Sequence, residues 1–296
     1  MAPNPNTSGR RTAWVNWLTK PDSAPQSLMA RVQVNRFWQH YFGKGIVDTT
    51  DNLGMSGAPP SHPELLEYLA AYLVEHEWSL KEMHRLILHS RAFKQSSLHQ
   101  DRAAEIDPEN KKYWRFHRQR LNAEALRDAM LYAAGALDEK MHGPYITSMR
   151  NSSGETVVAE TEPGARRRSI YLYQRRTQIP NMLQVFDAPK IVFNCTRRNV
   201  STTPLQSLAL MNSEFIRSRA AELATETLKL DLLDQQIQFV YQRVYTRTPT
   251  QDEIELLGQF IEQQIDFYTD QENARLAAWT DCCQMLMASS EFLYIQ

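Results

Sequence analysis

The sequence has little glycine, little cysteine and no long apolar run. Only 10 of its 296 residues are glycine, which argues against a turn-rich all-β fold. Its three cysteines show no C-x-x-C spacing of the kind found in zinc and redox motifs. No segment approaches the roughly 20 consecutive apolar residues that span a bilayer. These absences argue against a disulfide framework, a zinc ribbon and a transmembrane segment.

Motifs for phosphate, metal and nucleophile chemistry are missing as well. The sequence contains no P-loop, no G-x-G-x-x-G, no H-E-x-x-H and no G-x-S-x-G. His84 and His89 are five residues apart, so they diverge on a helix and do not form a metal-binding pair. We therefore expect no metal site and no cofactor in this chain.

The beginning of the chain is polar. Residues 1–10 are rich in proline and asparagine and contain no apolar core. This composition predicts a disordered lead over residues 1–10 and no signal peptide in this chain.

The charge is balanced overall but not along the chain. The net charge is −1, yet residues 164–219 carry ten Lys/Arg and two Asp/Glu, whereas residues 222–272 carry three and eleven. Either the two segments pack together and neutralise each other, or the basic segment faces an anionic ligand. A nucleic-acid partner fits poorly, because the net charge is near zero and no recognition motif is present.

Most of the periodic patterns in the sequence are helical. Val34, Phe37, Trp38 and Tyr41 recur on one helical face. Capping patterns after residue 60 and after residue 78 predict two successive helices, which should form an αα-hairpin. Four more helices are predicted near the C-terminus, over residues 203–228, 231–245, 250–268 and 273–291.

One segment has the composition of a strand. Residues 169–174 are rich in β-branched and aromatic side chains, and Val157 and Val158 offer a partner for them. We therefore predict a mainly α fold, a multi-helix array with a small β-hairpin near residues 155–175 and a C-terminal helical bundle. We expect a helical domain over 11–198 with an inserted loop and the hairpin, and a bundle over 199–296 packed tightly on it.

Several segments, spread from Gly9 to Tyr294, together resemble one family. They include RVQVNRFWQHYFGKG from Arg31, SHPELL from Ser61, RLNAEALRD from Arg120, RRSIY from Arg167, FDAP from Phe186, Cys195 with Arg198, STTPLQSL from Ser201, CQMLM from Cys283 and SEFLY from Ser290. The family is the planctomycete C-terminal domain of unknown function that accompanies cytochrome c-like domains in large envelope proteins.

This resemblance implies a location more than an activity. The family has no established catalytic residues to carry over. The domains that usually accompany this family imply an exported protein of the periplasm or cell envelope, with other domains of the same parent protein as partners. The chain has neither the haem motif nor the domain that usually comes first, so we expect it to be the C-terminal piece of a longer protein.

Four residues are candidates for catalysis. Glu124 and Asp128 lie four residues apart, so they share a helical face and could divide acid and base roles. His40 and Asp187 are further acid/base candidates. The alternative is that Glu124 and Asp128 belong to a salt-bridge lattice with neighbouring arginines.

Two arginines on the first long helix are candidates for ligand binding. Arg31 and Arg36 lie near His40 on the segment 31–45 and could bind a carboxylate or sulfate. The alternative is a buried polar network that ties this helix to the loop at residues 43–60.

The arginine-rich region is the most distinctive part of the sequence. It contains runs of arginine at 166–168, 175–176 and 197–198, and a planar guanidinium suits sulfate, phosphate or carboxylate. We name as ligand-binding candidates Arg167, Arg168, Tyr171, Arg175 and Arg198. The alternative is that these arginines pair with the acidic C-terminal helices.

Three functions remain open at this point. The chain could be a binding or scaffold domain for an anionic polysaccharide, a polysaccharide hydrolase with paired carboxylates, or a structural module that docks other domains of its parent protein.

Overall fold

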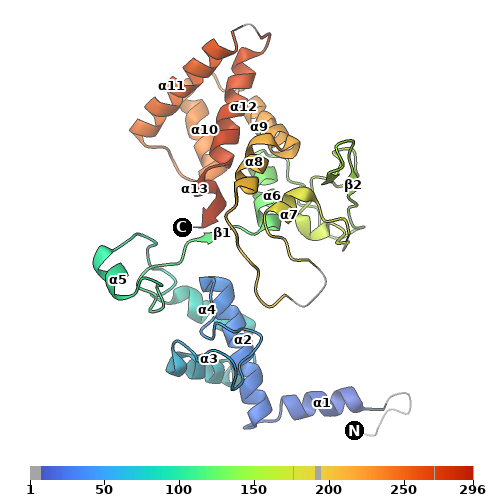
Figure 1. The fold of residues 1–296 in the computed structure, drawn as a ribbon, viewed down its shortest axis with the longest axis vertical. Coiled ribbons are helices and arrows are strands. Elements are labelled where there is room, and N and C mark those ends of the chain that lie inside the picture. The colour runs from blue at the N-terminus through green and yellow to red at the C-terminus, as the bar shows by residue number, and fades with distance from the viewer. Residues whose placement is uncertain (1–7, 176, 191–194, 270, 296) are drawn as a thin grey trace. The chain divides into compact units, whose positions relative to one another are not determined.

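A computed structural model describes residues 8–175, 177–190, 195–269 and 271–295. The described chain is mainly helical, with short strands that pair as two-stranded sheets (Figure 1), and this confirms the mainly α prediction. The helices are α1 (Arg10–Leu18), α2 (Ala24–Phe42), α3 (Pro63–Glu75), α4 (Leu80–His89), α5 (Asp101–Ile106), α6 (Ala123–Ala133), α7 (Asn181–Val185), α8 (Pro204–Asn212), α9 (Glu214–Thr227), α10 (Leu233–Tyr245), α11 (Gln251–Phe267), α12 (Ala274–Met287) and α13 (Ser290–Leu293). The strands are β1 (Gln119–Arg120), β2 (Met149–Arg150), β3 (Thr156–Val157) and β4 (Tyr294–Ile295), and a 3-10 helix η1 covers Ser169–Tyr171.

The lead predicted over residues 1–10 falls largely outside the described residues, which begin at Ser8, and Arg10 is already helical. No helix among the described residues combines the length and the apolar character needed to cross a membrane.

The chain divides into two compact units. The first ends at Gln119, and the second covers Arg120–Ile295. The boundary expected near Asn199 lies inside the second unit, because α6 packs against α9 and α7 packs against α8. Residues 120–198 therefore share one core with the C-terminal helices.

The first unit is built on α2, α3 and α4. Phe42 and its neighbours on α2 pack with apolar residues of α3 and α4, which form the predicted αα-hairpin. Gly43 ends α2 in the left-handed conformation, with φ 78°. Asn35 is buried, and its side-chain amide exchanges two hydrogen bonds with the backbone of Val47, at 2.9 and 2.8 Å. A Cβ atom at Gly45 would lie 2.7 Å from the Asn35 amide, so this turn requires glycine.

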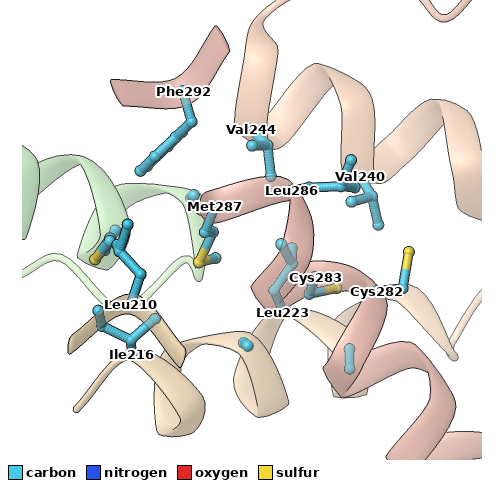
Figure 2. Close-up of a cluster of buried hydrophobic side chains, with 14 of the residues drawn as sticks. Leu210, Ile216, Leu223, Val240, Val244, Cys282, Cys283, Leu286, Met287 and Phe292 are labelled. Carbon is cyan, nitrogen blue, oxygen red and sulfur yellow. The ribbon is translucent and has the colours of Figure 1, made fainter. Parts of the chain in front are cut away.

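The second unit has a larger core, centred on α9, α10 and α12. Figure 2 shows side chains from these helices and from α8 and α13 meeting around the C-terminal half of α12. Trp279, Cys282 and Cys283 are fully buried in this core. Burial raises the pKa of the Cys282 thiol to about 12, so these cysteines are apolar packing groups.

The segment predicted as the main strand is not a strand. Residues 169–171 form η1, and the hairpin lies earlier in the chain, where Met149 pairs with Val157 in the antiparallel sheet of β2 and β3. The reason is a distant contact. The backbone N–H and hydroxyl of Ser169 both donate to the carboxylate of Asp128, at 2.8 and 2.7 Å. This removes the donor that a strand ladder at Ser169 would use.

Candidate functional site

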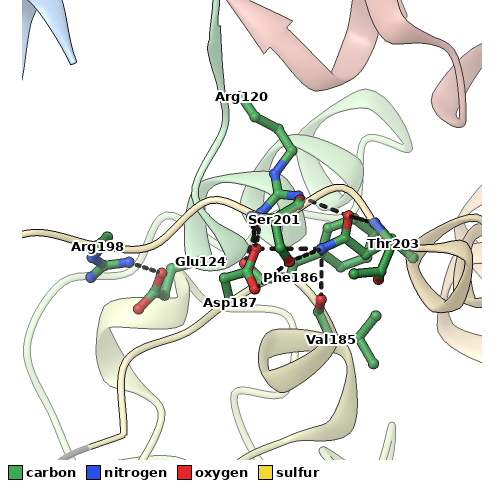
Figure 3. Close-up of polar contacts among 9 residues, drawn as sticks. Arg120, Glu124, Val185, Phe186, Asp187, Arg198, Ser201 and Thr203 are labelled. Atoms are coloured by element: carbon green, nitrogen blue, oxygen red, sulfur yellow. Dashed lines mark hydrogen bonds and ion pairs between the residues drawn. The ribbon is translucent and has the colours of Figure 1, made fainter. Parts of the chain in front are cut away.

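A polar cluster forms where three segments of the second unit meet (Figure 3). Arg120 lies just before α6, Asp187 follows the end of α7, and Ser201 and Gln206 flank the start of α8. Asp187 has φ 66°, in the left-handed region that Asp and Asn tolerate better than most residues. This turn aims its carboxylate back toward Arg120.

The Arg120 guanidinium is surrounded by hydrogen-bond acceptors of the protein. Its Nη2 donates to Asp187 Oδ2 at 2.6 Å, and its Nη1 donates to Gln206 Oε1 at 2.9 Å and to the Ser201 carbonyl. The backbone N–H and hydroxyl of Ser201 donate to the two oxygens of the same carboxylate, at 2.8 and 2.7 Å. The Arg120 side chain is 4% exposed and that of Asp187 is 20% exposed. The pair is therefore held inside the protein with almost every polar atom in use; Arg120 Nε is the exception, buried without a hydrogen-bond partner.

The surroundings keep Asp187 ionised. Burial alone raises the pKa of its carboxyl, but the hydrogen bonds from Ser201 and the guanidinium of Arg120 outweigh burial and hold the pKa below its ordinary value. A carboxylate is a poor general acid or base near neutral pH when its pKa is lowered and its oxygens already accept hydrogen bonds from protein groups.

The other carboxylate candidates are also engaged. Glu124 accepts a hydrogen bond from Arg198 Nη1 at 2.6 Å, in a pair whose side chains are 21% and 43% exposed. Asp128 accepts both donors of Ser169. His40 is exposed on α2, in the first unit. The second unit thus engages Asp128 and Asp187 in internal hydrogen bonds and Glu124 in an ion pair at the surface, and it does not bring them together as an open pair of carboxylates.

Surface hollows lie elsewhere. One of about 440 Å³ lies between α9 and α12 and is lined by residues such as Arg217 and Tyr268. Another of about 470 Å³ lies in the first unit, beside the loop at residues 53–60. Neither hollow is lined by Glu124, Asp128 or Asp187. Within the described ranges, no group of three or more His, Cys, Asp or Glu side chains could hold a metal ion.

Two of the arginines named from the sequence, Arg167 and Arg198, already bind other groups of the protein. Arg167 is 5% exposed, and its guanidinium donates to the backbone carbonyls of Lys140, His142 and Pro144. It also lies 3.8 Å above the ring of Tyr171. Arg198 pairs with Glu124. Arg167 therefore holds the loop at 140–144, and its donors are not presented to solvent.

Arg31 is occupied in a different way. Its Nε and Nη2 donate to the two oxygens of Glu67, both at 2.7 Å, in a bidentate pair on the surface of the first unit. The polar network that ties α2 to the following loop is made by Asn35 instead. Arg36 is exposed and forms no ion pair with a described residue.

Two candidates remain open to solvent in the second unit. Arg168 and Arg175 are exposed, and no described carboxylate lies within ion-pair distance of either. Arg166, between Glu160 and Glu222, behaves differently and neutralises charge within the fold, including charge on α9. Both sequence interpretations of the arginine-rich region therefore apply, each to different residues.

An exposed aromatic pair lies beside Arg175. The rings of Tyr145 and Tyr173 have centroids 4.6 Å apart, and the two residues are 61% and 41% exposed. The guanidinium of Arg175 lies 5.1 Å from the Tyr173 ring centroid, and its Nη1 donates to Gln178 Oε1 at 3.0 Å. Ile146 exchanges backbone hydrogen bonds of 2.8 Å with Tyr171 and Tyr173, which fixes the two segments side by side. We call Tyr145, Tyr173, Arg175 and Gln178 the tyrosine–arginine surface.

Some of these residues gave little signal in the sequence. Tyr145 follows a Gly-Pro pair in a segment without periodicity, so nothing there predicted its contact with Tyr173. Ser201 stands in a run of hydroxyl residues before a helix, a pattern typical of helix capping. Gln206 stands three residues after Thr203, as in a capping box, and its Oε1 does accept from Thr203 N–H at 3.3 Å. The additional bond to Arg120 spans 86 residues, and local patterns cannot reveal it.

Comparison with known proteins gives a family but no activity. No curated protein and no solved structure matches the chain. A family model described as "protein of unknown function (DUF1553)" matches residues 10–261, which is most of the chain and includes the Arg120–Asp187 cluster and the tyrosine–arginine surface. The chain therefore belongs to this family of proteins of unknown function.

Proposed function

We propose that this chain is a binding module for an anionic polysaccharide, within an exported multidomain envelope protein of the planctomycete type. The tyrosine–arginine surface carries the proposal. Tyrosine rings can lie against the apolar faces of sugar rings, while a guanidinium with free donors can bind carboxylate or sulfate in a bidentate manner. Arg175 retains such donors, because Gln178 is the described group that accepts from it.

The surface is rigid enough to recognise a ligand. The backbone hydrogen bonds between Ile146 and the segment 171–173 fix Tyr145 against Tyr173, and Arg167 anchors the loop just before Tyr145. Binding at a preorganised surface costs less conformational entropy than binding at a mobile loop. We infer the envelope location and the association with cytochrome c-like domains from the resemblance of the sequence motifs to the planctomycete domain family.

The test is a binding titration of the purified chain with sulfated, carboxylated and neutral polysaccharides at low and moderate salt. Arg175→Ala should weaken binding of an anionic glycan roughly tenfold or more, since a charge-assisted hydrogen bond contributes about 1.5–3 kcal/mol. Tyr173→Ala should also weaken binding, because it removes the ring that lies against the sugar. Arg91→Ala and Tyr68→Ala are matched controls, because both residues are exposed in the first unit. Binding that survives both site substitutions would refute the assignment to this surface.

Docking of another protein domain is the second candidate function. On α8, Leu205, Leu208 and Met211 are 66%, 51% and 68% exposed, and their spacing places them on one side of the helix. Exposed apolar stripes of this kind often mark protein contacts. If no glycan binds, binding of other domains of the parent protein, with Leu208→Ser as the disrupting variant, is the experiment that tests this candidate.

A further inference from the structure

Helix α1 is exposed along most of its length, with Leu18 partly buried at its end, although it carries large apolar residues. None of the nine residues of Arg10–Leu18 is buried. Trp14, Val15 and Trp17 are 61%, 48% and 57% exposed. Isolated helices shorter than about 12–15 residues are marginal in water. A helix of this length, with two exposed tryptophans, is therefore best explained by a partner that covers it.

The residues of α1 specify what this partner must offer. Trp14, Trp17 and Leu18 have i, i+3, i+4 spacing and share one side of the helix. Arg10 lies on the same side, four residues before Trp14 and seven before Trp17. Thr12 and Asn16 lie on the opposite side. The partner must therefore present apolar and negatively charged groups together, over one surface.

The charge around α1 has a single sign. Arg10, Arg11 and Lys20 are basic, and the segment from Arg10 to Pro21 contains no Asp or Glu. The interface of an anionic membrane combines a negative surface with an apolar layer just beneath it. Tryptophan is enriched at this depth, because its ring is apolar and its N–H can still reach water.

We propose that α1 binds the surface of an anionic lipid membrane, lying in the interface with Trp14, Trp17 and Leu18 inserted and Arg10 and Arg11 at the headgroups. The arginine stems can lie along the apolar layer while their charged ends reach the phosphates. The surface is distinct from the tyrosine–arginine surface, so this proposal does not depend on the proposed function.

The test measures partition of the full chain into vesicles of phosphatidylcholine alone and of phosphatidylcholine with about one third phosphatidylglycerol. Each basic side chain near an anionic surface strengthens binding by roughly fivefold, so Arg10→Gln/Arg11→Gln should weaken binding to the anionic vesicles by roughly 25-fold. Trp14→Ala/Trp17→Ala should abolish it. Because α1 buries no side chain, neither double variant should unfold the rest of the chain.

Met55→Ala is the matched control, since Met55 is a fully exposed apolar residue in the same unit. It should bind vesicles like the unaltered chain, and so should Tyr173→Ala, which separates this test from the glycan test. Quenching of tryptophan emission by brominated lipid should disappear in Trp14→Ala/Trp17→Ala. Three results would overturn the proposal: equal binding to neutral and anionic vesicles, no binding to either, or binding that persists in Trp14→Ala/Trp17→Ala. The absence of binding to either vesicle would indicate that a protein surface covers α1.

Discussion

Replacing Asp187 by Asn should destabilise the second unit far more than breaking a neighbouring ion pair on the surface. The substitution keeps the shape of the side chain, and Asn tolerates the left-handed backbone at φ 66°. It removes the counter-charge of Arg120, whose side chain is 4% exposed. Removing one partner of a buried pair costs about 3–5 kcal/mol. We expect a loss of about 3 kcal/mol, at the lower end of that range, because Arg120 keeps Gln206 and Ser201 as acceptors.

Three other variants isolate the cause of this loss. Asp187→Ala should cost about 1 kcal/mol more than Asp187→Asn, because alanine is strained in the left-handed region. Arg198→Ala breaks the Glu124 pair, whose arginine side chain is 43% exposed, and should cost at most about 1 kcal/mol. Arg120→Met combined with Asp187→Asn should cost less than the sum of the two single substitutions, because no unpaired charge remains buried.

The pH dependence supplies an independent check. The pKa of Asp187 is lowered in the folded chain, so its stabilising contribution is complete above the ordinary value of about 3.9 and is lost as pH falls through the folded pKa. The difference in stability between the unaltered chain and Asp187→Asn should therefore shrink below about pH 4.

The assay is urea unfolding, monitored by amide hydrogen exchange in α9 and α12. The signal then comes from the second unit. A loss in Asp187→Asn no larger than that in Arg198→Ala would refute the view that this cluster holds the second unit together.

Three further predictions concern other parts of the chain. Arg167→Ala should lower the free energy of unfolding by about 1.5–3 kcal/mol, because the buried Arg167 guanidinium would no longer donate to the carbonyls of Lys140, His142 and Pro144. Arg168→Ala should change it by less than about 0.5 kcal/mol, and equal losses in urea unfolding would contradict the internal role of Arg167. The pKa of Glu253 is lowered to about 2, mainly by its hydrogen bonds with Arg247, and should rise toward its ordinary value in Arg247→Ala. In the unaltered chain its stabilising effect should be complete above its ordinary pKa and be lost as pH falls through about 2. NMR titration of the Glu253 carboxyl in the two proteins measures the two pKa values. Of the three cysteines, exposed Cys195 should react rapidly with a thiol reagent in the native chain, whereas Cys282 and Cys283 should react only after denaturation; equal rates for all three would show that the core is open.

The sequence predicted the helices where local signals act alone. The helix predicted from Thr250 is present as α11, and Thr250 and Glu253 form a capping box at its start. The helix expected over 203–228 is present but divided, since Ser213 ends α8 and begins α9. A change of direction of this kind depends on packing against α12 and has no strong local signal.

The predictions failed where distant residues compete for the same groups. The composition of residues 169–174 favours a strand, but Asp128 takes the backbone donor of Ser169 from 41 residues away. The arginine runs looked alike in sequence. Their environments separate them, because Arg167 binds carbonyls inside the loop at 140–144 while Arg175 lies over an exposed ring. Sequence patterns identified the residue types of the candidate surface but not which of them face solvent.

The most direct test of the proposed function is the affinity of the unaltered chain and of Arg175→Ala for a sulfated and a carboxylated polysaccharide, measured at low and moderate salt. The proposed function predicts binding that weakens as salt rises and that falls roughly tenfold or more in Arg175→Ala. Salt-independent binding, or equal affinity in the two proteins, would contradict recognition of an anionic glycan at the tyrosine–arginine surface.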